Sequence, residues 1–222
     1  MSAQKIVASS RQSVVAIALI LFGFALAGTV VALHLKSVRT EAKLPPGAET
    51  SSRAPSTVRP DDQQVGLHAV APNNPKYISI PSISTGNLRI FGLGLLADST
   101  IAAPGNIYDT GWYKGSAQPG QGGAMFLYGH VSSWQARGAF YDLHKMVPGQ
   151  DIIVTRGDNA RFTYRVVATK TYAYDAVNMK KVLAPIDAIK PGLNLMTCAG
   201  RIIKGTNDFD KRYVVFASLV TD

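Results

Sequence analysis

The chain holds a single cysteine, Cys198, at the end of a short apolar run over 193–197. This run is typical of a buried strand, and Ala199-Gly200 after it predicts that the strand ends there. The sulfur would then lie at a rim and not deep in a core. One cysteine cannot form an internal disulfide, so Cys198 is either a small buried hydrophobic residue or a reactive thiol.

A histidine follows another apolar run. The residues at 124–128 predict a strand, and Gly129-His130 comes directly after it. The glycine would let the backbone turn or approach a ligand closely. A thiolate attacks carbonyl carbon, and an imidazole can protonate the amine that leaves. His130 is therefore our candidate acid and base, unless it is an ordinary loop histidine.

An arginine opens the last predicted strand, 212–219. The guanidinium of Arg212 could donate hydrogen bonds to a carbonyl oxygen as that oxygen gains charge. Lys211 and Arg201 lie nearby in the sequence and remain alternatives for this role. A thiol, an imidazole and a guanidinium at strand ends together predict a nucleophilic acyl-transfer site.

The elements that must position these groups are mostly strands. Short runs rich in Val, Ile, Tyr and Phe alternate with Pro-Gly and Gly-Asp turn signals. Helical signal is sparse, with short candidates at 140–146 and 177–189. The pattern predicts a mainly-β barrel or sandwich of seven or eight strands. The predicted strands are 77–80, 88–95, 124–128, 151–155, 161–172, 193–197 and 212–219.

The beginning of the chain has a different composition. Residues 1–13 are polar, and residues 14–33 carry no charge. Twenty helical residues span about 30 Å, which matches the hydrocarbon core of a bilayer. We therefore expect a cytoplasmic N-terminus at 1–13 and a transmembrane signal-anchor at 14–35. A cleaved signal peptide is the alternative, because Ala25-Leu26-Ala27 resembles a cleavage site.

Residues 36–75 are rich in Pro, Ser and Thr and poor in large apolar residues, so we expect a flexible linker. The folded catalytic domain would then occupy 76–222. An anchor with its N-terminus inside would place this domain outside the cytoplasm.

The chain has 23 basic and 14 acidic residues, a net charge of +9. The excess is spread along the chain, with no basic stripe and no recognition-helix pattern, which argues against nucleic-acid binding. No paired Cys or His spacing predicts a metal site, and Gly92-x-Gly94 lacks the rest of a phosphate-binding loop. We therefore expect no cofactor.

In these motifs the chain resembles the sortases, which are membrane-anchored cysteine transpeptidases. The thiol motif of that family is Thr-Leu-x-Thr-Cys, and residues 194–198 depart from it only at Asn194. Gly129-His130 matches the Gly-His of the family, and residues 140–143 match its Phe-x-x-Leu segment. Arg212 matches its arginine on the final strand. Residues 111–113, Gly-Trp-Tyr, look most like class F, or classes D and E.

The resemblance implies an eight-stranded sortase-type β-barrel with one or two short helices after a single transmembrane helix. It implies cleavage of a C-terminal Leu-Pro-x-Thr-Gly-type sorting motif between Thr and Gly, through a thioester on Cys198. His130 would act as acid and base, Arg212 would stabilise the oxyanion, and Thr197 would bind substrate. No metal or other cofactor is implied.

The implied partners are surface proteins that bear the sorting motif, and an amine acceptor such as a peptidoglycan precursor or a pilin lysine. The cell membrane would be contacted through 14–35. Two other functions stay open on the residues alone. One is a hydrolytic cysteine peptidase, and the other is a non-catalytic, membrane-tethered β-module with Cys198 buried.

Overall fold

The computed structural model describes residues 54–221. Among these residues no helix is both long enough and apolar enough to cross a membrane. The predicted cytoplasmic segment at 1–13 and the predicted anchor at 14–35 lie outside the described residues.

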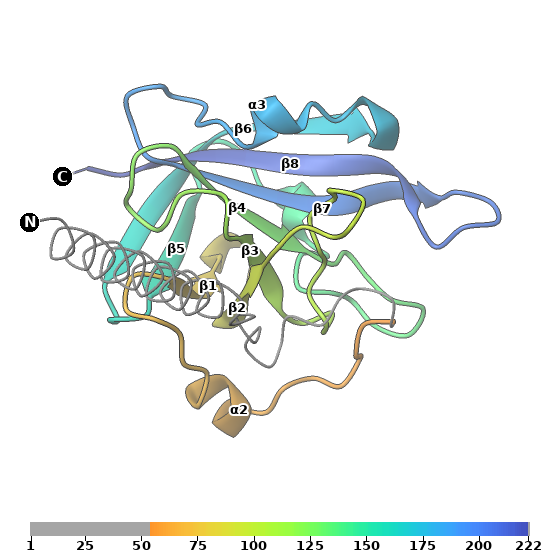
Figure 1. The fold of residues 1–222 in the computed structure, drawn as a ribbon, viewed down its shortest axis with the longest axis horizontal. Coiled ribbons are helices and arrows are strands. Elements are labelled where there is room, and N and C mark those ends of the chain that lie inside the picture. The colour runs from red at the N-terminus through yellow and green to blue at the C-terminus, as the bar shows by residue number, and fades with distance from the viewer. Residues whose placement is uncertain (1–53, 222) are drawn as a thin grey trace, which may run out of the picture. The chain divides into compact units, whose positions relative to one another are not determined.

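Eight strands close into a barrel in the order β1-β2-β3-β4-β7-β8-β6-β5 (Figure 1). The predicted mainly-β, eight-stranded barrel is thereby confirmed. Two strand pairs are parallel, β2 with β3 and β4 with β7, and the rest are antiparallel. The strands are β1 (Pro75–Ser79), β2 (Leu88–Leu93), β3 (Thr110–Tyr113), β4 (Ala124–Gly129), β5 (Asp151–Arg156), β6 (Arg161–Ala173), β7 (Gly192–Ile202) and β8 (Phe209–Leu219).

The helices within residues 54–221 are all short. This part of the chain has the α-helices α2 (Asp62–Gly66) and α3 (Met179–Val182). It also has the 3₁₀ turns η1 (Pro81–Ile83), η2 (Leu143–Lys145) and η3 (Tyr174–Ala176). The turn η2 falls in the predicted helical segment 140–146, and α3 falls in the predicted segment 177–189, which Pro185 interrupts.

Side chains alternate between two apolar clusters along β4, β7 and β8. Met125, Leu195 and Val215 point into the barrel, where they join its main core. Phe126 and Val214 point outward and join a second cluster with Val182 of α3. Successive side chains of a strand face opposite sides, so one stretch of sequence builds both clusters. This second cluster, which we call the outer cluster, lies directly beneath the candidate site.

Two strands differ from the prediction. β3 was missed, because it has only four residues and includes Gly111. β7 does not end before Ala199-Gly200 but continues to Ile202, with an irregular register between Ala199 and Ile202. Gly200 has φ +84°, a conformation that glycine adopts without strain, so the strand bends here and does not stop.

Part of the predicted linker packs on the barrel. The ring of His68 lies 4.7 Å from the ring of Phe91, and its Nε2 is 3.0 Å from the Ile90 carbonyl oxygen. Farther upstream, the Ser56 amide donates to the Gly105 carbonyl at 2.8 Å. Residues 54–74 therefore have contacts that we did not expect of a flexible linker over 36–75. A few apolar and hydrogen-bonding residues hold this segment against the barrel.

Candidate active site

Cys198 lies within β7 and faces outward. It is directly opposite Arg212 in the antiparallel pair of β7 and β8. Residues opposite each other in such a pair have Cα atoms about 5 Å apart. The thiol is half-buried and not sealed in the barrel. The rim position that we predicted for the sulfur therefore arises from the outer face of a continuing strand.

The nearest polar group to the thiol is one that sequence reasoning missed. The Tyr128 hydroxyl oxygen lies 3.1 Å from Cys198 Sγ. Tyr128 comes from β4, which pairs in parallel with β7 so that Tyr128 is opposite Met196. The hydroxyl can donate to a thiolate, and a thiolate is the stronger acceptor. Tyr128 therefore stabilises the reactive form of the cysteine.

His130 follows Tyr128 on the same side of the chain, one residue after Gly129. Its ring centroid is 6.2 Å from the ring of Tyr128, and its Nε2 is 2.8 Å from the Pro104 carbonyl oxygen. A carbonyl only accepts hydrogen bonds, so Nε2 carries the proton in the neutral ring. Nδ1 is then the nitrogen that is free to accept a proton.

Arg212 is held by its own hairpin. Its Nη2 donates to both carboxylate oxygens of Asp208, at 2.8 and 2.9 Å, and its Nη1 donates to the Phe209 carbonyl at 2.8 Å. The Arg212 side chain is 15% exposed and that of Asp208 is 48% exposed. The bonds made by Nη1 and Nη2 together fix the plane of the guanidinium beside the thiol strand. Neither Arg201 nor Lys211, the alternatives to Arg212, lines a pocket with these groups.

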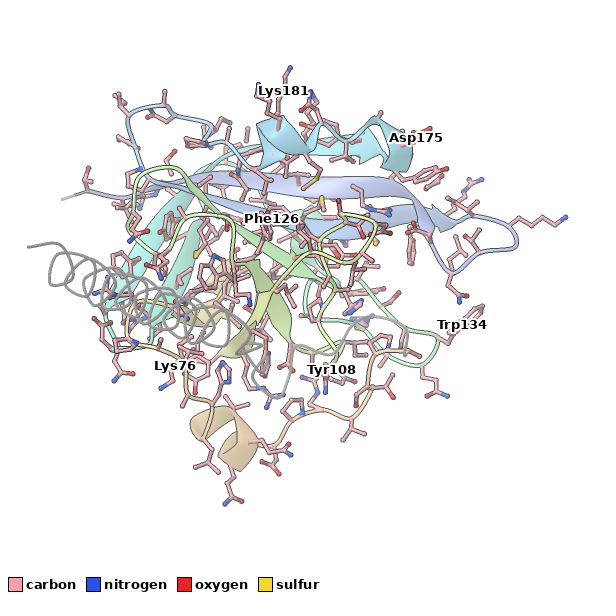
Figure 2. All side chains as sticks on the ribbon, viewed as in Figure 1. Lys76, Tyr108, Phe126, Trp134, Asp175 and Lys181 are labelled. Atoms are coloured by element: carbon pink, nitrogen blue, oxygen red, sulfur yellow. The ribbon has the colours of Figure 1, made fainter. Side chains whose placement is uncertain are left out.

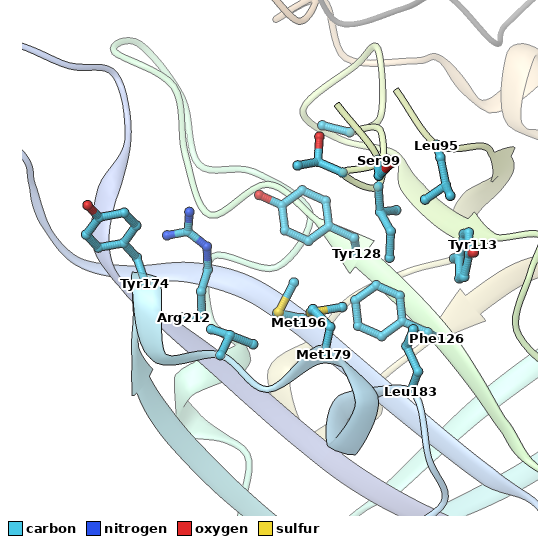
Figure 3. Close-up of a pocket in the computed structure, with 14 residues that line it drawn as sticks. Leu95, Ser99, Tyr113, Phe126, Tyr128, Tyr174, Met179, Leu183, Met196 and Arg212 are labelled. Atoms are coloured by element: carbon cyan, nitrogen blue, oxygen red, sulfur yellow. The ribbon is translucent and has the colours of Figure 1, made fainter. Parts of the chain in front are cut away.

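Two pockets meet at Tyr128. The first, about 510 Å³, holds Arg212 and is otherwise lined mainly by apolar side chains, among them Phe126, Met179 and Met196. We call it the donor-side pocket, after the substrate that we propose for it below. Figure 3 shows Arg212 and Tyr174 at one end of it and Leu95 and Tyr113 at the other. The thiol-side pocket, about 520 Å³, contains Cys198, His130 and Asp208. The structure therefore brings the cysteine and the histidine into one pocket, and it places Arg212 in the neighbouring pocket.

Burial favours the neutral form of both catalytic candidates. It raises the pKa of the Cys198 thiol, although the hydrogen bond from Tyr128 and the charge of Arg212 both act to lower it. Burial lowers the pKa of His130, and the Pro104 hydrogen bond opposes this. Burial also raises the pKa of Tyr128 well above its usual value, so Tyr128 remains a phenol that can donate. Both shifts favour the neutral forms of the two groups, a thiol and an imidazole, over the ion pair.

Thr197 differs from our expectation of a substrate-binding residue. It is 2% exposed, and its hydroxyl donates to the Gly129 carbonyl at 2.7 Å. Because Cys198 faces outward, strand alternation turns Thr197 toward the interior. Its hydrogen bond ties the thiol strand to the Gly-His strand, so it positions the site without contacting either pocket.

Asn194 also has a role that the sequence did not reveal. It is fully buried, and its Nδ2 donates to the carbonyls of Val182 and Ala184, at 2.7 and 2.8 Å. These carbonyls belong to the connection between β6 and β7, which forms one wall of the donor-side pocket. A threonine, which the family motif has here, has a single hydroxyl donor and could not make both bonds.

Comparison with known proteins agrees with this architecture. A family model described as the sortase domain matches residues 78–220. The fold is similar to sortase A from Corynebacterium diphtheriae, in a lid mutant, with 24% identity and a TM-score of 0.51 over 72% of this chain and 77% of that one. It is also similar to sortase C1 of Streptococcus agalactiae in a complex with MTSET, with 18% identity and a TM-score of 0.50 over 72% and 75% of the two chains. A search of curated proteins finds no match.

A barrel that carries a half-buried thiol beside an imidazole and a guanidinium defines a thiol-dependent acyltransferase. The matched segment covers well over half of the chain, and the chain belongs to the sortase family. The protein is accordingly a cysteine transpeptidase.

Proposed function

We propose that the protein cleaves a C-terminal Leu-Pro-x-Thr-Gly-type sorting motif between Thr and Gly and transfers the acyl group to an amine. The observation that carries this proposal is the position of Cys198. Its sulfur is accessible, contacts the Tyr128 hydroxyl, shares a pocket with His130 and lies opposite Arg212.

The donor peptide would lie in the donor-side pocket. This pocket suits a short apolar segment, because its walls are aromatic, aliphatic and methionine side chains. Arg212 is the one charged side chain among the described residues that line it. The guanidinium would donate to the carbonyl of the bond to be cleaved, so the peptide would run along the outer cluster toward Cys198.

The reaction would proceed in two halves. The Cys198 thiolate attacks the threonine carbonyl carbon, Arg212 stabilises the resulting oxyanion, and the imidazolium of His130 donates its Nδ1 proton to the leaving glycine amine as the C–N bond breaks. A thioester on Cys198 and a neutral His130 remain. An incoming amine then attacks the thioester, His130 accepts the proton of that amine, and the C–S bond breaks to restore the thiolate.

The protein would act at the outer surface of the cell membrane, with 14–35 as a single-pass anchor. This placement is supported by the charge-free run at 14–33 and by the substrates that the family implies. Donors would be surface proteins with the sorting motif, and the acceptor would be a peptidoglycan precursor or a pilin lysine. Class F, with classes D and E as the alternatives, remains our prediction for the subclass.

The test is a peptide library that varies the sorting motif, incubated with the full-length protein in detergent and with triglycine as the amine. Mass spectrometry should find motif peptides cut after Thr and joined to triglycine. Cleavage products that carry only water would instead support a hydrolytic peptidase. No cleavage of any peptide by a protein whose thiol reacts with iodoacetamide would contradict the proposal.

A further inference from the structure

The charges of the two pockets differ in sign. Among the described residues that line the donor-side pocket, the charged one is Arg212, and among those that line the thiol-side pocket it is Asp208. We infer that the thiol-side pocket is the binding site of the acceptor, and that Asp208 recognises a primary ammonium group there. This inference rests on the proposed function and adds to it the location and the charge of the acceptor site.

The thiol-side pocket is placed correctly for the second half of the reaction. It contains the sulfur that would hold the acyl group and the imidazole that must take a proton from the attacking amine. The donor-side pocket contains neither of these residues. An amine in the thiol-side pocket could therefore reach the thioester while the rest of the acyl group still occupied the donor-side pocket.

Asp208 is held in a defined orientation by its loop. Its Oδ1 accepts from the Phe209 amide at 2.8 Å, and its own amide donates to Thr206 Oγ1 at 3.1 Å. The two carboxylate oxygens bind Arg212, yet the side chain remains 48% exposed. A carboxylate has about four acceptor positions, so the exposed part can accept a second cation.

Trp134 supplies an apolar surface at the same pocket. Its side chain is 86% exposed at the tip of the loop after β4, as Figure 2 shows. Ser132 and Ser133 lie beside it, and Tyr128 and Phe209 continue the lining toward the thiol. An exposed indole next to hydroxyl groups can pack against the backbone or the aliphatic stem of an acceptor. A primary amine carried on a short peptide or an alkyl chain fits this combination.

The chemistry needs a proton acceptor for the ammonium. At neutral pH a primary amine is mostly protonated and cannot attack a thioester until it loses one proton. Asp208 would bind the ammonium form, and neutral His130 would remove the proton through Nδ1. Burial lowers the pKa of His130, so the imidazole is in the form that can accept that proton.

The experiment measures the ratio of the two products that form when two nucleophiles compete for the same thioester. The full-length protein receives a sorting-motif peptide, triglycine, and hydroxylamine, which is mostly uncharged at neutral pH. The ratio of triglycine product to hydroxamate depends only on steps after acylation, and any change in oxyanion stabilisation by Arg212 acts on both nucleophiles and cancels in the ratio. In Asp208→Asn this ratio should fall roughly two- to fivefold, the effect of losing a partly exposed charge pair.

Asp210→Asn is the matched control, because Asp210 lies in the same hairpin outside both pockets and binds the Arg201 amide. Its ratio should stay that of the natural protein. Trp134→Ala should lower the ratio about threefold through lost apolar contact. Added salt should lower the ratio in the natural protein and leave it nearly constant in Asp208→Asn, because salt screens exposed charges.

Two failures can be told apart. If the natural protein forms neither product, the proposed function is overturned together with the acceptor site. If both products form and neither Asp208→Asn nor salt changes their ratio, transpeptidation stands and the acceptor site is wrong. The salt dependence of the natural protein decides the matter if Asp208→Asn fails to fold.

Discussion

The two pockets on either side of Tyr128 share a wall but differ in what they contain. The donor-side pocket is apolar and holds a cation, while the thiol-side pocket holds the nucleophile, the imidazole and a carboxylate. Arg212 and Asp208, the two charged groups, bind each other across this boundary. Under the proposed function, the two substrates would approach from opposite sides. Tyr128, which lines both pockets, is placed to affect both steps.

Four substitutions test the two pockets and their support, and removal of the His130 imidazole should have the largest effect among them. In His130→Ala we expect kcat/KM to fall about 10²- to 10⁴-fold, because neither half-reaction keeps its proton carrier. His144→Ala is the matched control, since His144 lies outside both pockets and contacts the Tyr141 carbonyl. A loss of similar size in His144→Ala would show that the fold, and not proton transfer, is affected.

The same residues predict a pH profile. Activity needs a thiolate together with an imidazolium, and their joint fraction is constant between the pKa of His130 and the higher pKa of Cys198. Below the His130 pKa the thiolate fraction falls, and above the Cys198 pKa the imidazolium is lost. Because burial moves these pKa values apart, kcat/KM should form a broad bell, rising below pH 6.5 and falling above pH 9. A narrow bell centred near pH 7 would contradict this.

Arg212→Ala tests the cation of the donor-side pocket. We expect a loss of about 10²- to 10³-fold in donor kcat/KM, because the oxyanion loses its donor. Arg212→Lys should recover little, since an ammonium cannot reproduce the planar, bidentate geometry. Arg201→Ala should have almost no effect, because Arg201 lines neither pocket. The reverse result, with Arg201 required and Arg212 dispensable, would overturn the assignment.

Tyr128→Phe removes only the hydroxyl group that contacts the Cys198 sulfur. The Cys198 thiolate then loses a donor, so the thiol pKa should rise and the thiolate fraction should fall about tenfold. The rate of alkylation by iodoacetamide, measured against pH, reports this directly. Tyr141→Phe, outside both pockets, should leave the alkylation profile unchanged. An identical profile in Tyr128→Phe would mean that the hydroxyl does not act on the thiol.

Asn194→Ala concerns stability more than chemistry. It leaves the carbonyls of Val182 and Ala184 without the donor that binds them, and we expect a loss of about 2–3 kcal/mol in the free energy of unfolding. Asn73→Ala, at an exposed asparagine, should change stability by less than about 0.5 kcal/mol. Denaturant unfolding measures both. Unchanged stability in Asn194→Ala would show that the clamp on the β6–β7 connection is dispensable.

Much of the fold could be read from the sequence, because apolar runs and turn residues mark long strands well. β3 was not predicted, because a strand of four residues is too short to show a clear alternation of apolar and polar side chains. The end of β7 was misjudged because Gly200 bends a strand as readily as it stops one. The contacts of His68 with Ile90 and Phe91 could not be predicted, because they depend on the folded barrel.

In the site, strand alternation contained information that we did not use. If Cys198 faces outward, Thr197 must face the interior, and if His130 faces the site, Tyr128 two residues earlier faces it too. The pairing of Arg212 with Asp208 is different. It depends on the conformation of a hairpin loop, and sequence spacing alone does not distinguish it from a free arginine.

The most direct test of the account is trapping the acyl group on the sulfur. The full-length protein and a sorting-motif peptide, without an amine, should yield a protein heavier by the acyl fragment, and peptide mapping should place that mass on Cys198. Cys198→Ala should show no added mass and no cleavage while it unfolds at the same denaturant concentration. Cleavage that persists in Cys198→Ala, or an acyl group found on another residue, would contradict the account.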